Sequence, residues 1–142
     1  MKQLLQVEIP IKVRFSDTDA MGVVWHGNYL RFFEDAREAF GIKYGLTYLD
    51  VYHRGYFTPI VKSSVEHKSP INYGEEVVAI AKFHPTPSAK IMFDFDILNK
   101  TTGKLSAKGH TTQVYLSVDE REMELVKPPF YIEWEKSIGI KH

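Results

Sequence analysis

The chain has 142 residues, a length typical of one domain, and 44% of them are hydrophobic. Because 18 basic residues balance 18 acidic ones, no basic surface is predicted for nucleic acid or an anionic membrane. The absence of cysteine excludes disulfides, thiolate nucleophiles and thiolate metal ligands. We therefore expect one globular domain over residues 1–142 that folds without a disulfide or a metal.

The N-terminal segment is predicted to be a strand over about 7–15, because apolar side chains alternate there with polar ones. Pro10 has no N–H to give to a neighbouring strand, so it is expected at a sheet edge or a bulge. The run MKQLLQVEIPIKV is interrupted by polar residues and is typical of neither a signal peptide nor a membrane span. No membrane insertion is expected, and the predicted location is the cytoplasm.

An aspartate-rich turn comes next, with Asp17 and Asp19 just before Gly22, and it leads into a helix. A carboxylate in such a turn can face a carbonyl carbon. The free N–H groups at the start of the helix can then hold the carbonyl oxygen. This pairing of a nucleophile or base with an electrophilic stabiliser is typical of acyl-transfer sites.

The helix is predicted over about 28–40, with Asn28 at its N-cap and Gly41 in the left-handed position after its last turn. Bulky aromatic side chains recur on one face at helical spacing, so we expect a sheet to wrap around it. Further along the chain, a short helical turn is predicted near 47–52 and strands at 58–67, 76–84, 90–98 and 105–118.

The order of one strand, one helix and four strands predicts an α+β fold. Consecutive antiparallel strands curling around the helix would bury its aromatic face. The C-terminal aromatic residues Phe130, Tyr131 and Trp134 are expected to pack down loosely. A lone curved sheet leaves exposed edges, so self-association is expected.

The segment DTDAMGVVWHGNYLRFFEDAR resembles the signature of the hotdog-fold acyl-CoA thioesterases of the 4-hydroxybenzoyl-CoA thioesterase class. The positions of this signature are filled by Asp19, Gly22, Val23, Val24, His26 and Tyr29. The later segment FTPIVKSSVEHKSPINYGEEVVAI resembles the second and third strands of the family, so the similarity covers about 7–118. The resemblance implies an antiparallel curved sheet wrapped around one long central helix. It also implies a homodimer or homotetramer that needs no cofactor.

The resemblance further implies that Asp19 is the catalytic carboxylate, acting as nucleophile or as general base on water. Backbone N–H groups near His26 would polarise the thioester carbonyl. Because His26 resembles the short-chain acyl-CoA branch, aliphatic acyl-CoA is expected to be hydrolysed at least as efficiently as hydroxybenzoyl-CoA. The expected substrate-binding residues are Gly22, Val24, Trp25, Tyr29 and Thr58.

Plainer interpretations exist for several of these residues. Asp19 could be a turn aspartate, Tyr29 a core residue and Thr58 an ordinary strand residue. Asp17 is expected to stabilise the turn as a hydrogen-bond acceptor. Glu34 is the main rival of Asp19, because another branch of hotdog thioesterases places its carboxylate on the central helix. The charged neighbours of Glu34, which are Arg31, Arg37 and Glu38, favour a solvated or interface salt bridge instead.

Two other functions fit the same fold: an acyl-thioester hydratase or dehydratase, and a non-catalytic module that binds acyl-CoA or acyl carrier protein. The hydratase branch has an aspartate followed five residues later by histidine, whereas Asp19 and His26 are seven apart. The histidines show no HxH or HExxH spacing, and no GxSxG or nucleotide-binding glycine motif occurs. The predicted function is therefore hydrolysis of an acyl-CoA thioester without a metal, with acyl carrier protein as the alternative carrier.

Overall fold

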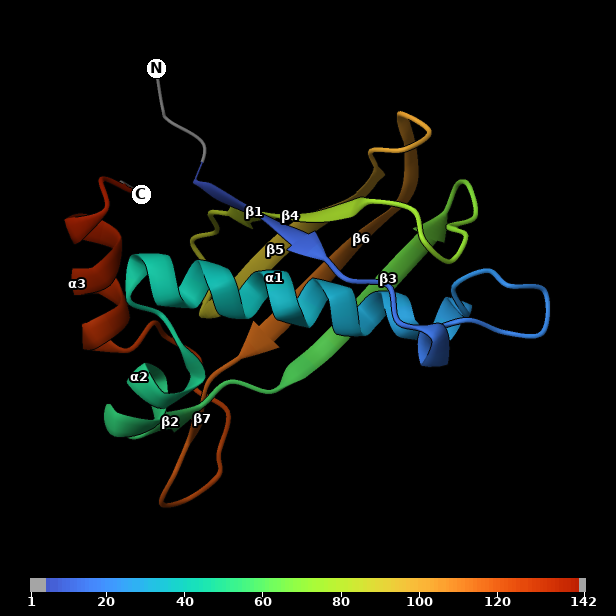
Figure 1. Cartoon of the computed structure of the whole chain (residues 1–142). Helices are drawn as coiled ribbons and strands as arrows, with labels where there is room; N and C mark the ends of the chain where they lie inside the picture. The colour runs from blue at the N-terminus through green and yellow to red at the C-terminus, as the bar shows by residue number, and fades with distance from the viewer. Residues whose placement is uncertain (1–4, 141–142) are drawn as a thin grey trace.

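A sheet of five strands curves around one face of a long helix in the computed structural model, which describes residues 5–140 (Figure 1). The first four residues of the N-terminal segment lie outside the described residues. The main sheet contains β1 (Gln6–Ile11), β3 (Ile60–His67), β4 (Val77–His84), β5 (Lys90–Asn99) and β6 (Lys104–Val114). The remaining elements are η1 (Phe15–Asp17), η2 (His26–Asn28), α1 (Tyr29–Tyr44), α2 (Tyr48–His53), β2 (Tyr56–Phe57), β7 (Leu116–Ser117) and α3 (Pro129–Ser137).

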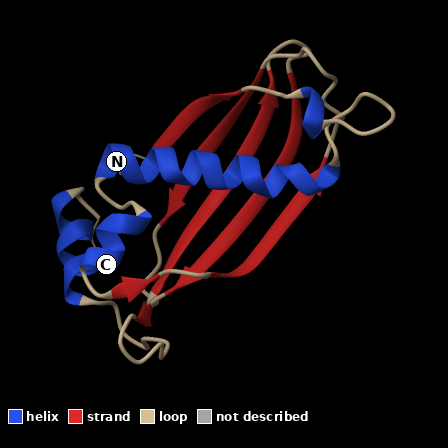
Figure 2. Cartoon of the chain, turned by 60° about the horizontal axis from the view of Figure 1, so that its bottom comes forward, coloured by secondary structure: helices blue, strands red, loops and turns tan. Residues whose placement is uncertain are grey.

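The strand order is β1-β4-β5-β6-β3, with every pair antiparallel. The predicted α+β architecture is confirmed, but consecutive strands do not all pair, because β3 and β4 lie at different places in the sheet. The connection between them crosses one end of the sheet, where Ile71 is fully buried and its carbonyl accepts the Val24 N–H at 2.8 Å. Figure 2 shows the central helix lying across the concave side of the strands.

The inner face of α1 supplies much of the core. It is made of Tyr29, Phe32, Phe33, Ala36 and Phe40, all buried. The Phe33 ring stacks on Phe95 with 4.7 Å between centroids, and Phe40 meets Phe93 edge-on at 4.8 Å. Gly109 of β6 has to be glycine, because a Cβ there would lie 2.1 Å from the Phe33 ring. Burying each such aromatic side chain contributes about 1.5–3 kcal/mol, which is what anchors the helix in the sheet.

The helix runs past its predicted end. Gly41 is inside α1 and buried. A larger residue would not fit at this position, because a Cβ there would lie 2.6 Å from the Leu46 carbonyl oxygen. The left-handed position is taken by Gly45, with φ of 75°. At the other end Asn28 occupies the N-cap, but its side chain caps no helical N–H; its amide donates to the Asp17 carbonyl at 2.8 Å.

The predicted strand boundaries needed three corrections. The first strand ends at Ile11, because the chain turns into η1 before the end of the alternating pattern. Thr58 and Pro59 lie between β2 and β3, so the strand predicted over 58–67 begins at Ile60, and Tyr115 separates β6 from β7. The short helix α2 is where it was expected, and Thr47 caps it by accepting the Asp50 N–H at 3.0 Å.

The C-terminal aromatic residues do not pack loosely, and that prediction was wrong. They form α3, in which Tyr131 and Trp134 belong to the buried core and the Trp134 indole donates to the Tyr44 carbonyl at 2.6 Å. Lys127 and Glu135 make an ion pair at 2.8 Å with both side chains largely buried. Tyr131, Trp134 and Glu135 fall at helical spacing, so the segment packs as one face of a helix against the end of the sheet.

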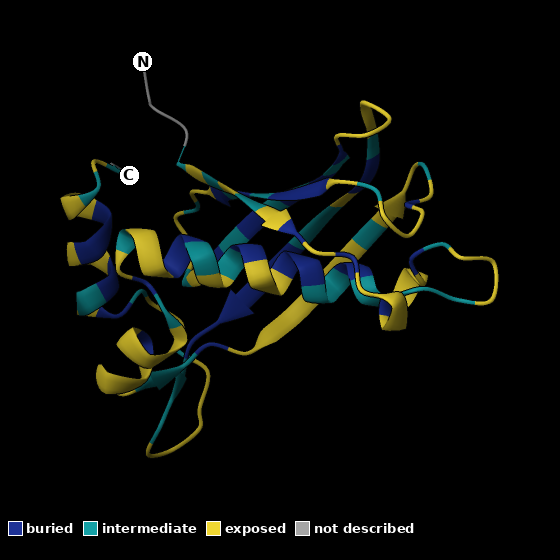
Figure 3. Cartoon of the chain, viewed as in Figure 1, coloured by how far each residue is buried: buried dark blue, intermediate teal, exposed yellow. Residues whose placement is uncertain are grey.

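The two edges of the main sheet differ. β1 carries Pro10, which confirms the expected edge position and leaves that edge short of one donor. β3 forms the opposite edge and is exposed along almost its whole length (Figure 3). Within residues 5–140 no helix is long and apolar enough to cross a membrane.

We predict that Trp134→Ala lowers the free energy of unfolding by about 3–5 kcal/mol, because it removes a buried ring and a hydrogen bond. Urea denaturation followed by circular dichroism measures this. Ile132→Ala on the same helix is the control, because Ile132 is 40% exposed and should cost less than about 1 kcal/mol. Equal effects of the two substitutions would show that α3 is not docked through Trp134.

Candidate active site

Asp17 holds the loop before α1 in place. Its side chain is only 2% exposed, and its two oxygens accept from the Arg14 N–H at 2.9 Å and from the Arg31 guanidinium at 2.8 Å. Its carbonyl accepts from the Trp25 N–H at 2.9 Å. Burial alone would raise the pKa of Asp17, but the Arg14 N–H and the Arg31 guanidinium outweigh it and hold that pKa below its ordinary value. Asp17 is thus a structural acceptor, as the sequence predicted.

Asp19 lies in the same loop but is bound much less. One carboxylate oxygen, Oδ1, accepts the Met21 N–H at 2.8 Å. No donor in the described part of the chain is bonded to the other oxygen, Oδ2. The Asp19 N–H donates to the Val23 carbonyl at 2.9 Å, and Gly22 closes the turn with φ of +76°. The backbone of Asp19 is therefore fixed, while one oxygen of its carboxylate is available to a substrate or a water.

The start of the helix offers free donors. The turn η2 precedes α1, and in the described chain no acceptor is bonded to the N–H of His26 or Gly27. The ring of Trp25, which is half exposed, lies against Gly27, where a Cβ would come within 2.1 Å of it. Val24, in the same loop, is buried. Two unbonded N–H groups at a helix start can stabilise a developing oxyanion.

His67 is a neighbour of this helix start that the sequence analysis missed. It is the last residue of β3, and its ring lies 4.9 Å from the Tyr29 ring and 6.3 Å from the His26 ring. Tyr29 itself is buried, and burial raises its pKa. No local sequence signal joins His67 to His26, because they meet only through the path of β3 past the helix.

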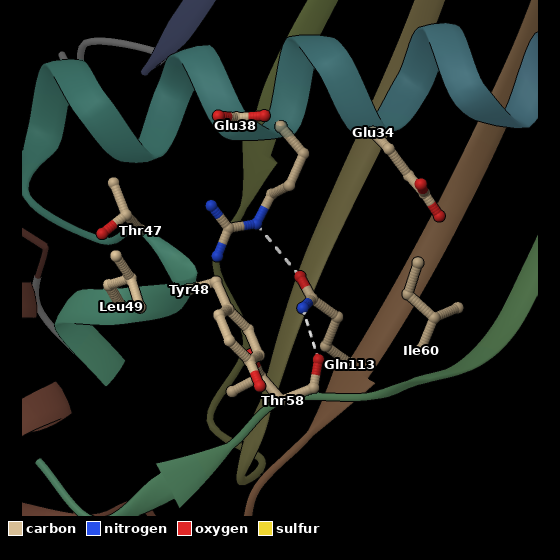
Figure 4. A pocket seen from close by; sticks show the side chains of 9 residues that line it. Glu34, Glu38, Thr47, Tyr48, Leu49, Thr58, Ile60 and Gln113 are labelled. Atoms are coloured by element: carbon tan, nitrogen blue, oxygen red, sulfur yellow. Dashed lines mark hydrogen bonds between the residues drawn. The ribbon is translucent and has the colours of Figure 1, made fainter. Parts of the chain in front are cut away.

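A pocket of about 740 Å³ lies further along α1, between that helix, α2 and the start of β3 (Figure 4). It is lined by Glu34, Arg37, Glu38, Thr47, Tyr48, Leu49, Thr58, Ile60 and Gln113. In Figure 4 the side chains of Tyr48, Thr58 and Gln113 lie together at one side, and Glu34 extends towards Ile60 at the other. This size is typical of small-molecule sites.

The polar groups of the pocket are held by hydrogen bonds. The Gln113 amide donates to the Thr58 carbonyl at 2.6 Å, and the Arg37 Nε–H donates to the Gln113 Oε1 at 3.0 Å. The Arg37 Nη1 donates to the Leu46 carbonyl at 2.9 Å. Glu34 is exposed and forms no ion pair within the described residues, and a salt bridge of Glu34 at an interface stays a prediction.

The structure thus divides the predicted site residues into two groups. Asp19 and His26 lie in and after the loop at the start of α1, with Gly22, Val24, Trp25 and Tyr29. Thr58 lies in the pocket together with Glu34. No cluster of His, Asp or Glu that could hold a metal occurs in residues 5–140.

Comparison with known proteins places the chain in a family. Residues 13–134 match the family model described as the Thioesterase-like superfamily, and the chain belongs to that family. It is 30% identical over 132 residues to the putative acyl-CoA thioesterase YneP of Bacillus subtilis, covering 89% of this chain and 94% of that protein.

The chain is also similar to solved structures, among them two thioesterases. The DHNA-CoA thioesterase of Staphylococcus aureus has a TM-score of 0.82 and 27% identity, with 94% of this chain and 90% of that chain covered. The 4-hydroxybenzoyl-CoA thioesterase of Pseudomonas sp. strain CBS-3 has a TM-score of 0.77 and 23% identity, with 91% and 98% covered. The predicted hotdog fold, and the resemblance on which it was based, are confirmed.

We predict that Asp17→Asn destabilises the protein at pH 7 by about 1–3 kcal/mol, because a charge-assisted bond to a buried acceptor is lost. A carboxylate whose pKa is lowered by folding stabilises the protein fully above its unfolded pKa of about 3.9, and this is lost as the pH falls through the folded value. The difference between Asp17→Asn and wild type should therefore be largest near pH 7 and shrink below about pH 4.

Urea unfolding at several pH values measures this difference. Asp35→Asn, on the exposed side of α1, is the matched control and should change stability by less than about 0.5 kcal/mol. A difference that stays constant down to pH 3 would contradict the ionised state assigned to Asp17.

Proposed function

We propose that the chain is an acyl-CoA thioesterase whose reacting centre is Asp19 together with the first N–H groups of η2 and α1. The observation that carries this proposal is a carboxylate with one free oxygen in a loop that ends at two unbonded helix-start N–H groups. The loop is a tight hairpin, because Thr18 pairs with Val24 and the Asp19 N–H bonds the Val23 carbonyl. A carboxylate and an oxyanion site are thus held by one short stretch of backbone.

In this proposal the thioester carbonyl oxygen binds the N–H groups of His26 and Gly27. Asp19 either attacks the carbonyl carbon, forming a mixed anhydride that water hydrolyses, or takes a proton from an attacking water. In both routes the C–S bond breaks and the thiolate leaves, and the helix-start donors stabilise the charge on the carbonyl oxygen. Neither route needs a metal or an organic cofactor.

The alternative functions have less support. A hydratase or dehydratase needs a second acid–base group in the spacing that the sequence lacks. A module that only binds acyl-CoA or an acyl carrier protein has no use for a free carboxylate oxygen beside the helix start, where desolvation by a ligand would be unfavourable. The similarity of His26 to the short-chain branch favours an aliphatic acyl group.

We further propose that the pocket receives the acyl group and that the site is completed by a second copy in a homodimer or homotetramer. β3 begins at Ile60, which lines the pocket, and ends at His67, which contacts the start of α1. Two exposed β3 edges that pair antiparallel about a two-fold axis bring the His67 end of one copy beside the Ile60 end of the other. The reacting centre of each copy then faces the pocket of its partner.

We predict that Asp19→Asn lowers kcat by about 10³-fold or more without changing stability by more than about 1 kcal/mol, because it removes a group that acts in the chemical step. Steady-state release of free CoA thiol measures kcat, and urea unfolding tests the fold. Glu34→Gln, a change of the same kind in the pocket, should reduce kcat much less. If the two effects were reversed, the catalytic carboxylate would be Glu34.

We also predict that two inactive variants restore activity when mixed. One is Asp19→Asn, and the other is a pocket-filling variant such as Leu49→Trp, first shown to be inactive alone. After joint refolding, half of the dimers are mixed and each has one intact site of two, so about a quarter of wild-type activity should return. No recovery, with light scattering still showing a dimer, would mean that each site lies within one chain.

A further inference from the structure

Arg37 is a cation that lacks an anionic partner within the described residues. None of the ion pairs formed in residues 5–140 includes it. Its hydrogen-bond partners, Gln113 and the Leu46 carbonyl, are neutral, and its guanidinium lies over the Phe93 ring at 5.0 Å from the centroid. Burial lowers its pKa to about 10, so the group is still charged at neutral pH. Arg37 is half-buried, and charged groups that lose part of their water are normally paired with an opposite charge.

The guanidinium also keeps donors free. Arginine has five N–H bonds, and here one on Nε and one on Nη1 are used by the protein. No acceptor in the described part of the chain is bonded to Nη2. Nη2 thus keeps both of its N–H bonds and Nη1 keeps one, and a carboxylate can accept two hydrogen bonds from such donors.

These donors belong to a residue of the pocket wall. Arg37 lines the pocket of about 740 Å³ together with Thr47, Tyr48 and Gln113. The Gln113 side chain accepts from Arg37 and donates to the Thr58 carbonyl, so its amide group is fixed in one orientation and holds the guanidinium in place. The pocket thus contains a fixed cation with unused donors.

Two carboxylates, Glu34 and Glu38, also line this pocket. Both are exposed on the outer side of α1, where water and salt screen their charge. Within the described residues neither glutamate forms an ion pair with Arg37. The attraction between a ligand carboxylate and the less screened Arg37 guanidinium would therefore exceed the repulsion from the two solvated glutamates.

We propose that the pocket selects acyl groups that carry a carboxylate at the end remote from the thioester, and that Arg37 binds this carboxylate with two hydrogen bonds. The inference rests on the proposed function, in which the pocket receives the acyl group. It makes Arg37 a residue that determines substrate specificity and takes no part in bond breaking.

Three substrates of matched chain length test the proposal on the wild-type protein: hexanoyl-CoA, adipyl-CoA and the neutral amide adipamoyl-CoA. We expect kcat/KM for adipyl-CoA to exceed that of both others by about tenfold or more, mainly through KM, because a carboxylate bound by a fixed guanidinium contributes to ground-state binding. The advantage should persist at 0.5 M salt if the pair is shielded from water.

The variants Arg37→Met and Arg37→Lys test the residue. Arg37→Met should remove the preference for adipyl-CoA over hexanoyl-CoA, and Arg37→Lys should keep part of it because lysine has the charge without the paired donors. Lys43→Met, an exposed basic residue of the same helix, is the control and should keep the wild-type preference. If Arg37→Met does not fold, the wild-type comparison decides alone.

The possible results separate the two proposals. Hydrolysis of hexanoyl-CoA at least as efficient as that of adipyl-CoA would overturn the specificity inference and leave thioesterase function standing. A preference for 4-hydroxybenzoyl-CoA over benzoyl-CoA without a preference for adipyl-CoA would overturn it as well. Hydrolysis of none of these thioesters would overturn both.

Discussion

The contacts of Asp17 fix the geometry on which the candidate site depends. This buried carboxylate joins the Arg14 N–H on one side of the loop to the Arg31 guanidinium on the first turns of α1. Because Trp25 and Asn28 also donate to its carbonyl, the loop enters the helix along one path. The neighbouring Asp19 can then keep an oxygen free without losing its position. Asp17 and Asp19 are separated by one residue, but both carboxylate oxygens of Asp17 accept hydrogen bonds, whereas one oxygen of Asp19 is available to a ligand.

One face of the central helix packs in the core, and the opposite face lines the pocket. Its aromatic side is buried in the sheet, so its position is fixed by packing and independent of any ligand. Its other side presents Glu34, Arg37 and Glu38 to the pocket. A shift of the helix along its axis would break the ring contacts of Phe33 and Phe40, which keeps the pocket wall in register with the reacting loop.

The sequence predicts well what depends on local pattern. Alternation and helical spacing place most of the strands and α1, and the loop motif identifies Asp17 as a structural acceptor. Prediction from the sequence fails where an element is defined by contacts between residues that are distant along the chain. The interior place of Gly41 depends on the Leu46 carbonyl, and the docking of α3 depends on Trp134 reaching Tyr44.

The same limit explains what was missed at the site. The position of β3 beside β6 instead of β4 is what brings His67 to the helix start and the first residues of β3 to the pocket. Arg37 reads in the sequence as one charged residue among several on the outer side of a helix. Only the fold shows that its hydrogen-bond partners are neutral, since Gln113 lies 76 positions away along the chain.

The two tryptophans of the chain occupy environments that differ in kind. Trp134 is enclosed among aromatic rings in α3 and is only 9% exposed, whereas Trp25 is half exposed and lies against Gly27 at the helix start. We therefore expect their fluorescence to differ: emission from Trp134 at shorter wavelength, which follows unfolding, and emission from Trp25 at longer wavelength, which is open to added quenchers. The protein thus contains one intrinsic optical probe of its core and another of the loop that precedes its central helix.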